Sequence, residues 1–140
     1  MREIKFKAID SITKRWIYSN GYYFDGTNYW FITPNIDSPA IGFADYHIVL
    51  KNTICQYTGV KDKNDKEIYE GDIVKYSIYN EYTRELLSTL FEVVFHEGAF
   101  VQEHRIKLDP DYYKVTKTIW YEWDFTEVVD NIYENPELLE

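Results

Sequence analysis

The stretch Ile54–Tyr76, ICQYTGVKDKNDKEIYEGDIVKY, constrains the interpretation of the whole chain. An apolar run ends at Gly59, a charged tip follows over Lys61–Glu67, and a new β-branched run begins after Gly71. Glycine at such a corner supplies backbone angles that other residues resist. Asp72 is expected to accept a hydrogen bond from an amide two residues on. The stretch therefore predicts a strand, a solvated charged turn and a second strand.

The charged tip raises one alternative, a calcium loop, because several carboxylates crowd together in it. An EF-hand loop needs oxygen ligands at alternating positions, a central glycine and a final glutamate. Counting from Asp62, the fifth, sixth and twelfth positions hold Lys66, Glu67 and Ile73. The sequence therefore predicts no calcium site here.

The composition predicts one folded domain over residues 1–140. Hydrophobic residues make up 45% of the chain and aromatic residues 19%, including 14 tyrosines. A chain of this length buries about two-thirds of its unfolded surface. Tyrosine at this level favours strands and surfaces that are only partly dry.

Alternation and turn residues predict hairpins along the chain. The run EIKFKAI (Glu3–Ile9) alternates charged and apolar residues, as a half-buried strand does. Asn20-Gly21, Asp25-Gly26 and Glu97-Gly98 each separate two β-rich runs. Such dipeptides are typical of tight hairpin turns. The segment PNIDSPAIGFADYH, residues 34–47, predicts an irregular loop with at most one helical turn.

The last part of the chain predicts a strand followed by a helix. Thr118–Phe125 is aromatic and strand-like, whereas Glu127–Glu140 has apolar residues at helix-like spacing. The terminal PELLE (Pro136–Glu140) adds apolar residues that are expected to pack on the chain itself or on a neighbouring chain.

The charge of −9 is uneven: residues 1–33 carry +2, residues 120–140 carry −7, and the middle carries −4. No basic stripe exists, so direct binding of nucleic acid is disfavoured. Cys55 is the sole cysteine, which excludes an intrachain disulfide and a thiolate zinc cluster. No apolar run reaches the length of a signal peptide or a membrane span. We therefore expect a cytoplasmic protein without membrane contact.

The sequence offers no pattern typical of an enzyme. His47, His96 and His104 fit no metal or catalytic spacing, and the six glycines are scattered singly rather than in a phosphate-binding loop. Cys55 lies in a β-rich run, where a buried, inert thiol is expected. We predict no catalytic, cofactor-binding or metal-binding residues, no cofactor, and no enzymatic activity.

Three separated segments resemble the YopX family of phage and prophage proteins. Gln56–Tyr76 is very similar to the signature of that family, and Arg2–Asp10 and Val128–Glu140 are similar to its two ends. One departure is Asp65, where the family usually has glycine, so a left-handed backbone is expected at a non-glycine residue.

The resemblance implies a small, largely β protein with no accepted enzyme chemistry, no known cofactor and no active site to transfer. The segment EGDIV, Glu70–Val74, also resembles the first strand of SH3-like barrels, by fold analogy alone. The predicted fold is mainly β: N-terminal hairpins packed on a small bent sheet or SH3-like barrel, with a short C-terminal helix.

The predicted function is a phage-associated protein-interaction module. Exposed aromatic residues would dock on a host or phage protein, because aromatic side chains concentrate binding energy. The candidate contacts are Tyr22, Tyr23, Tyr29, Trp30, Tyr112 and Tyr113. The alternative is an acidic mimic of nucleic acid that occupies a host DNA-binding protein. Self-association into a homo-oligomer, with the terminal segment contributing contacts, is also expected, since hairpins leave edge strands to be covered.

Overall fold

The computed structural model describes residues 2–34, 44–109, 112–118 and 125–140, with only the backbone described for 105–109 and 112–118. The fold is mainly β, as the sequence predicts. The strands pair antiparallel in three open sheets. In the described ranges the other elements are short 3₁₀ turns, and no helix is long and apolar enough to cross a membrane.

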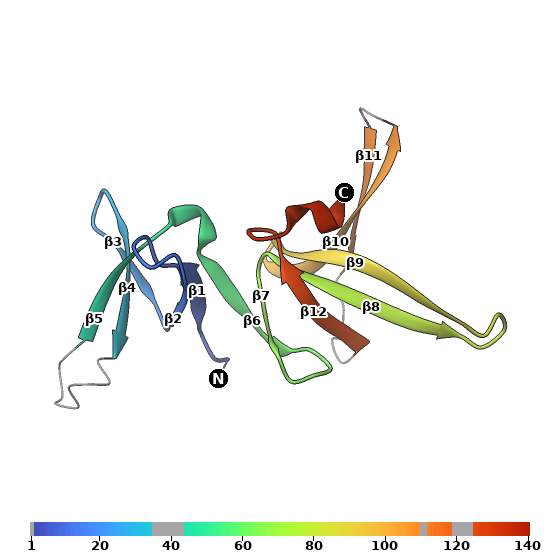
Figure 1. Ribbon diagram of the computed structural model, residues 1–140, viewed down its shortest axis with the longest axis horizontal. Helices are drawn as coiled ribbons and strands as arrows, with labels where there is room; N and C mark the ends of the chain where they lie inside the picture. Colours follow the sequence, from blue (N-terminus) through green and yellow to red (C-terminus); the bar gives the residue numbers. More distant parts are fainter. Residues whose placement is uncertain (1, 35–43, 110–111, 119–124) are drawn as a thin grey trace. The chain divides into compact units, whose positions relative to one another are not determined.

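The chain divides into two compact units, Met1–Tyr57 and Thr58–Glu140 (Figure 1). The elements of the first unit, up to the start of β6, are β1 (Phe6–Ile9), β2 (Trp16–Ser19), β3 (Tyr22–Phe24), β4 (Tyr29–Pro34), β5 (Ala44–Val49), η1 (Lys51–Thr53) and β6 (Cys55–Lys61). The second unit holds the end of β6 and then β7 (Glu67–Tyr69), β8 (Asp72–Asn80), β9 (Glu85–His96), β10 (Ala99–Asp109), β11 (Tyr112–Thr118), β12 (Thr126–Asn131) and η3 (Pro136–Leu139).

The first unit packs a β2–β1–β6 layer against a β3–β4–β5 sheet. A hydrophobic cluster in its core, among the described residues, contains Ala8, Phe31 and Val49, with partly buried hydrophobic residues around them. The predicted alternation in β1 holds for Ala8, but Lys7 is also buried. The alternating pattern predicts an exposed Lys7. In the structure the Lys7 ammonium lies 4.8 Å from the centre of the Trp16 ring, and the aromatic face stabilises its positive charge.

The predicted hairpin at Asn20-Gly21 is wrong. β2 pairs with β1 and β3 pairs with β4, so this dipeptide carries the chain from one sheet to the other. Neither residue has the positive φ that a type I′ turn requires. Instead, the Ser19 hydroxyl donates to the carbonyl oxygens of Gly21 and Ile32, and the Asn20 amide donates to that of Ile4.

The other predicted turns are confirmed. Asp25-Gly26 joins β3 to β4, where the Asp25 carboxylate accepts two backbone amides and Gly26 has a φ of 99°. Glu97-Gly98 joins β9 to β10, with φ of 48° and 85°. Asp65 in the β6–β7 tip has a φ of 65°, the left-handed backbone expected at this departure from the family pattern.

The second unit is built on a five-stranded sheet in the order β11–β10–β9–β8–β12. A hydrophobic cluster in its core, among the described residues, contains Ile68, Val74 and Val93. The β-branched run after Gly71 forms β8, as predicted. Ile73 and Val74 in it are both fully buried. The segment 34–47, predicted as an irregular loop, includes Pro34, the last residue of β4, and Ala44–His47, which belong to β5. The remainder, residues 35–43, lies outside the described residues.

Gly71 forms the predicted corner before β8. Its φ is 83°, its N–H donates to the Val93 carbonyl at 2.7 Å, and its carbonyl accepts the Ile132 N–H at 2.9 Å. The buried Asp72 carboxylate accepts the N–H of Tyr69, three residues before it, where β7 turns back at this corner. The bond expected from an amide two residues after Asp72 stays a prediction.

The predicted C-terminal helix is wrong. Thr126–Asn131 forms strand β12, which pairs with β8 through a register shift between Val128 and Asp130. The shift explains the misleading pattern, since an extra residue in a strand breaks strict alternation. Only Pro136–Leu139 is helical, as a 3₁₀ turn. The strand-like prediction for Thr118–Phe125 falls mostly on residues 119–124, outside the described residues.

No SH3-like barrel forms among the described strands, because each of the three sheets is open. The predicted single domain over residues 1–140 stays a prediction beside the two compact units.

Gly71→Ala is expected to lower the free energy of unfolding by about 1–3 kcal/mol. A Cβ atom built at Gly71 lies 2.8 Å from Cε2 of the Tyr133 ring, and the φ of 83° is unfavourable for alanine. Gly98→Ala is the matched control, since Gly98 has a φ of 85° but no atom within 4 Å of the added Cβ. Chemical denaturation of both variants separates the steric cost from the backbone cost. Equal losses would show that Tyr133 imposes no constraint.

Candidate functional site

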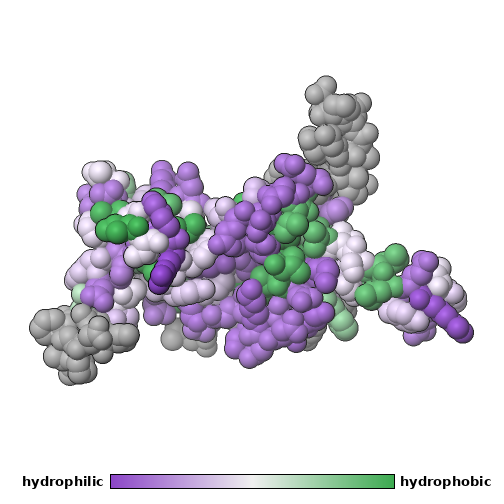
Figure 2. Space-filling model, in the orientation of Figure 1, coloured by the Kyte–Doolittle hydropathy of each residue, from purple (hydrophilic) through white to green (hydrophobic). Residues whose placement is uncertain are grey.

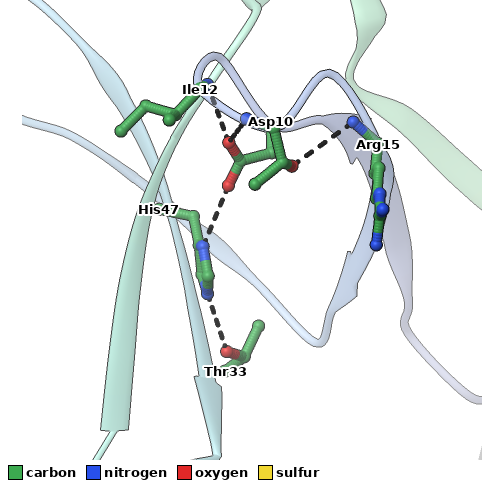
Figure 3. Close-up of polar contacts among 6 residues, drawn as sticks. Asp10, Ile12, Arg15, Thr33 and His47 are labelled. Atoms are coloured by element: carbon green, nitrogen blue, oxygen red, sulfur yellow. Dashed lines mark hydrogen bonds and ion pairs between the residues drawn. The ribbon is translucent and has the colours of Figure 1, made fainter.

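A chain of three polar side chains links the β1–β2 turn to the β3–β4–β5 sheet in the first unit (Figure 3). Asp10 Oδ2 lies 3.0 Å from Nδ1 of His47, and His47 Nε2 lies 3.2 Å from Oγ1 of Thr33. Asp10 is buried, whereas His47 and Thr33 are partly exposed. Three segments far apart in sequence therefore meet through side chains.

The Asp10 carboxylate also organises its own turn. Oδ1 accepts the backbone amides of Ile12 and Thr13, each at 2.8 Å, and the Asp10 amide donates to the Arg15 carbonyl. The hydrogen bond from the Thr13 amide is the main cause that holds the pKa of Asp10 below its usual value of 3.8. The Ile12 amide and the His47 ring lower this pKa further, whereas burial raises it. Asp10 is therefore more acidic in the folded chain than in the unfolded chain.

An aspartate, a histidine and a hydroxyl in series resemble the arrangement that activates a nucleophile. Here the carboxylate already closes a turn with two amides, and the imidazole bridges that turn to β4. Each contact joins elements of the fold. We therefore assign a structural role to the hydrogen-bonded series Asp10–His47–Thr33. The predicted lack of enzymatic activity stays a prediction.

The outer face of the β3–β4–β5 sheet presents exposed aromatic side chains in the described part of the first unit. Side chains alternate across a strand, so the register places one set on the face opposite the Phe31 core. We call this set the outer face: Tyr23, Trp30, Ile32, Tyr46 and Ile48. Tyr23 and Tyr46 are 60% and 66% exposed, and Ile32 is also exposed.

The predicted interaction residues divide between the two faces of this sheet. Tyr23 and Trp30 are cross-strand partners on the outer face, and the Trp30 ring N–H donates to Asp25. Tyr22 and Tyr29 lie on the inner face, with ring centres 5.9 Å apart. Tyr22 also contacts Phe6 edge to face at 5.2 Å, so part of its surface is used within the fold.

Tyr112 and Tyr113 begin strand β11, opposite Asp109 and Lys107 of β10. Their side chains lie outside the described residues. Tyr46 and Ile32, which the sequence analysis did not select, belong to the outer face. The signal that finds them is the strand register, because Ile32 pairs with Tyr46 only once β4 and β5 are aligned.

The charged tip is exposed at Lys61 and from Lys63 to Lys66, as predicted, but Asp62 within it is buried. Asp62 Oδ1 accepts the amides of Asn64 and Lys66, and Oδ2 accepts the Val128 amide at 2.8 Å. Both oxygens are directed at backbone donors, which a cation at this carboxylate would have to displace. The geometry favours an anchor between the β6–β7 tip and β12 over a metal ligand.

The remaining candidates for chemistry have structural surroundings. Cys55 is fully buried, as predicted, and its thiol lies 3.2 Å from the Thr53 carbonyl oxygen. His96 lies beside the β9–β10 turn, with its ring 3.6 Å from the Glu97 carboxylate. Nδ1 of His104 lies 3.0 Å from the Leu90 carbonyl oxygen.

Comparison with known proteins identifies relatives along the whole chain. A family model described as YopX protein matches residues 5–140. The SPbeta prophage-derived uncharacterized protein YopX of Bacillus subtilis (strain 168) is 38% identical over 76 residues, which cover 54% of this chain and 52% of that protein. The match thus spans about half the length of that curated relative. The crystal structure of protein EF1440 from Enterococcus faecalis covers 100% of both chains, with a TM-score of 0.56 and 28% identity.

Asp10→Asn is expected to lower the free energy of unfolding at neutral pH by about 1–3 kcal/mol, because charge-assisted hydrogen bonds become neutral ones. The folded-state pKa of Asp10 is lowered, so its contribution is present above the ordinary pKa of 3.8 and is lost as pH falls through the folded pKa. The difference between parent and variant should therefore vanish in acid.

Denaturant titrations from neutral pH to about pH 3 measure this difference. Asp25→Asn is the control, since Asp25 accepts two turn amides in the same way but is exposed. A loss that stays constant down to the lowest pH would contradict the assignment to the Asp10 carboxylate.

Asp62→Ala is expected to lower the free energy of unfolding by about 2–4 kcal/mol, because three backbone amides lose their acceptor. Asn64→Ala, an exposed change in the same tip, serves as the control. Millimolar calcium should leave the melting temperature of the parent unchanged. A calcium-dependent rise that disappears in Asp62→Ala would instead identify a metal site.

Proposed function

Because the chain belongs to the YopX family, we propose that it is a non-enzymatic prophage protein that acts by binding another protein in the host cytoplasm. The observation that carries the proposal is the outer face of the β3–β4–β5 sheet. Tyr23, Ile32 and Tyr46 are exposed there beside Trp30 and Ile48.

This face has the chemistry of a protein-binding surface. Tyrosine and tryptophan supply large contact areas at low entropic cost, and they keep one polar group for the wet rim of an interface. The ring N–H of Trp30 is already satisfied by Asp25 at 2.8 Å, so covering the ring leaves no buried donor without an acceptor. The strands beneath are rigidly paired, which limits the entropy lost on binding.

The alternative, an acidic mimic of nucleic acid, receives less support from the acidic end of the chain. The Glu127 carboxylate lies 3.4 Å from the ammonium groups of both Lys63 and Lys75. Its hydrogen bond with Lys75, together with the charge of Lys63, holds the pKa of Glu127 below the usual range. The carboxylates of Asp130 and Glu134 accept side-chain amides of Asn135 and Asn131. A mimic needs carboxylates presented outward in series, whereas these make contacts within the chain.

The proposal is tested by capturing partners of the tagged full chain from prophage-carrying cells and measuring affinity with the purified partner. Tyr46→Ala is expected to weaken binding by about 10- to 100-fold, because an aromatic anchor is truncated. Ile32→Asp should weaken it at least as much, since a charge would be placed in the contact. The affinity of the parent should change little with salt.

Ile12→Asp is the matched control. Ile12 is an 85% exposed isoleucine of the same unit that lies in the β1–β2 turn and is not one of the outer-face residues. Binding that disappears at high salt and survives Tyr46→Ala would support the acidic mimic instead. Equal loss in Ile12→Asp and Ile32→Asp would remove the outer face from the proposal.

A further inference from the structure

The dipeptide Asn20-Gly21, which carries the chain from β2 to β3, has a chemistry of its own. Asn20 is the one asparagine in the sequence that is followed by glycine. The side chain of an asparagine can be attacked at Cγ by the backbone nitrogen of the next residue. Glycine hinders this attack least, because it has no Cβ. Whether the reaction takes place depends on how the fold holds the two residues.

The fold leaves this dipeptide exposed and uncrowded. Asn20 and Gly21 are both exposed, and a Cβ atom built at Gly21 has no atom within 4 Å beyond its chain neighbours. The backbone is relaxed, because neither residue has a positive φ. A five-membered ring between the Asn20 side chain and the Gly21 nitrogen therefore has the space that it needs.

Two hydrogen bonds involve the groups that would react. Nδ2 of Asn20 donates to the Ile4 carbonyl oxygen at 3.0 Å, and the Gly21 N–H donates to Ser19 Oγ at 3.3 Å. The first bond is exposed, and exposed hydrogen bonds open at low free-energy cost. The second is longer than the usual range for N–H···O bonds, so it holds the nitrogen weakly. Neither bond is strong enough to prevent the attack.

We propose that Asn20 is a site of spontaneous deamidation in the folded chain. The Gly21 nitrogen forms a bond to Asn20 Cγ and loses its proton to water, while Nδ2 leaves as ammonia. Water then opens the five-membered imide. Opening at Cγ gives aspartate, and opening at the backbone carbonyl gives isoaspartate, in which the main chain runs through the side chain. The net reaction consumes a water molecule, releases ammonia and needs no oxidant or reductant.

The product weakens the contacts that join the two sheets of the first unit. The Asn20 amide donates to the Ile4 carbonyl oxygen, whereas a carboxylate in its place is an acceptor and repels that oxygen. An isoaspartate also lengthens the main chain between β2 and β3. This change lies next to Ser19, whose hydroxyl donates to the carbonyl oxygens of Gly21 and Ile32. Deamidation therefore gives the folded chain a lifetime that its own sequence sets.

Mass spectrometry of the full, folded chain tests the proposal after incubation in mildly alkaline buffer, which favours loss of the amide proton. The mass is expected to rise by the difference between an amide and a carboxylic acid, and fragment ions should place the change at Asn20. Asn64 is the internal control, because it is exposed but is followed by Asp65. Isomerisation at Asp25-Gly26 leaves the mass unchanged and so cannot imitate the result.

Gly21→Ala is the matched variant. The added Cβ meets no atom within 4 Å and the backbone has no positive φ, so the variant should fold and melt like the parent. Deamidation at Asn20 should be slower in it by at least about tenfold, because the Cβ hinders the attacking nitrogen. Asn20→Gln should also stay unmodified, since its longer side chain would have to close a larger ring. Asn20→Asp, the aspartate product, should melt below the parent.

Three results would overturn the proposal. In the first, the folded parent keeps Asn20 intact while the same chain unfolded in guanidinium chloride loses it, which would show that the fold protects the site. In the second, the parent and Gly21→Ala deamidate at equal rates. In the third, Asn20→Asp is as stable as the parent, and the modification then has no effect on the fold. Because the reaction requires neither Tyr46 nor Ile32, failure here leaves the proposed partner binding untouched.

Discussion

The second unit depends on the backbone of Gly71. Its N–H and carbonyl bind Val93 of β9 and Ile132 after β12, so one residue joins the strands on either side of β8. The corner is possible because glycine adopts a φ of 83° without strain, and because the absent Cβ leaves room for the Tyr133 ring. Asp72 then fixes the preceding turn by accepting the Tyr69 amide. The short EGD segment therefore determines where β7 ends, where β8 begins and where β12 is held.

Features determined by neighbouring residues were predictable from the sequence. Asp25-Gly26 and Glu97-Gly98 form hairpins because the turn geometry needs only the residues within it. Asn20-Gly21 is also a polar residue followed by glycine, but it does not form a hairpin. The side chains of Ser19 and Asn20 donate to the carbonyl oxygens of Ile32 and Ile4, and these long-range contacts redirect the chain. β12 was mistaken for a helix because a shifted register imitates helical spacing. Local patterns cannot reveal either effect.

The candidate site was predictable only in part, for the same reason. Aromatic richness indicated that β3 and β4 would present tyrosine and tryptophan, and Tyr23 and Trp30 do lie on the outer face. Neighbouring residues of a strand face opposite sides of the sheet. Tyr22 and Tyr29 therefore lie on the inner face, opposite their neighbours Tyr23 and Trp30. Tyr46 comes from β5, and its place beside Ile32 follows from register alone. The link from Asp10 to His47 likewise exists only because two sheets pack together.

The acidic character of the chain limits which surfaces can bind partners. Glu127, Asp130, Glu134 and Asp62 all contact cations or amides of the same chain, so much of the negative charge in the second unit serves the fold. Uncharged side chains are exposed on the aromatic sheet face of the first unit and on strands β8 and β9 of the second, whose apolar part is visible at the right of Figure 2. Contacts made by such surfaces depend on apolar burial, which salt screens little, rather than on long-range attraction. Since neither surface needs a basic partner, the net charge of −9 does not by itself identify what the protein binds.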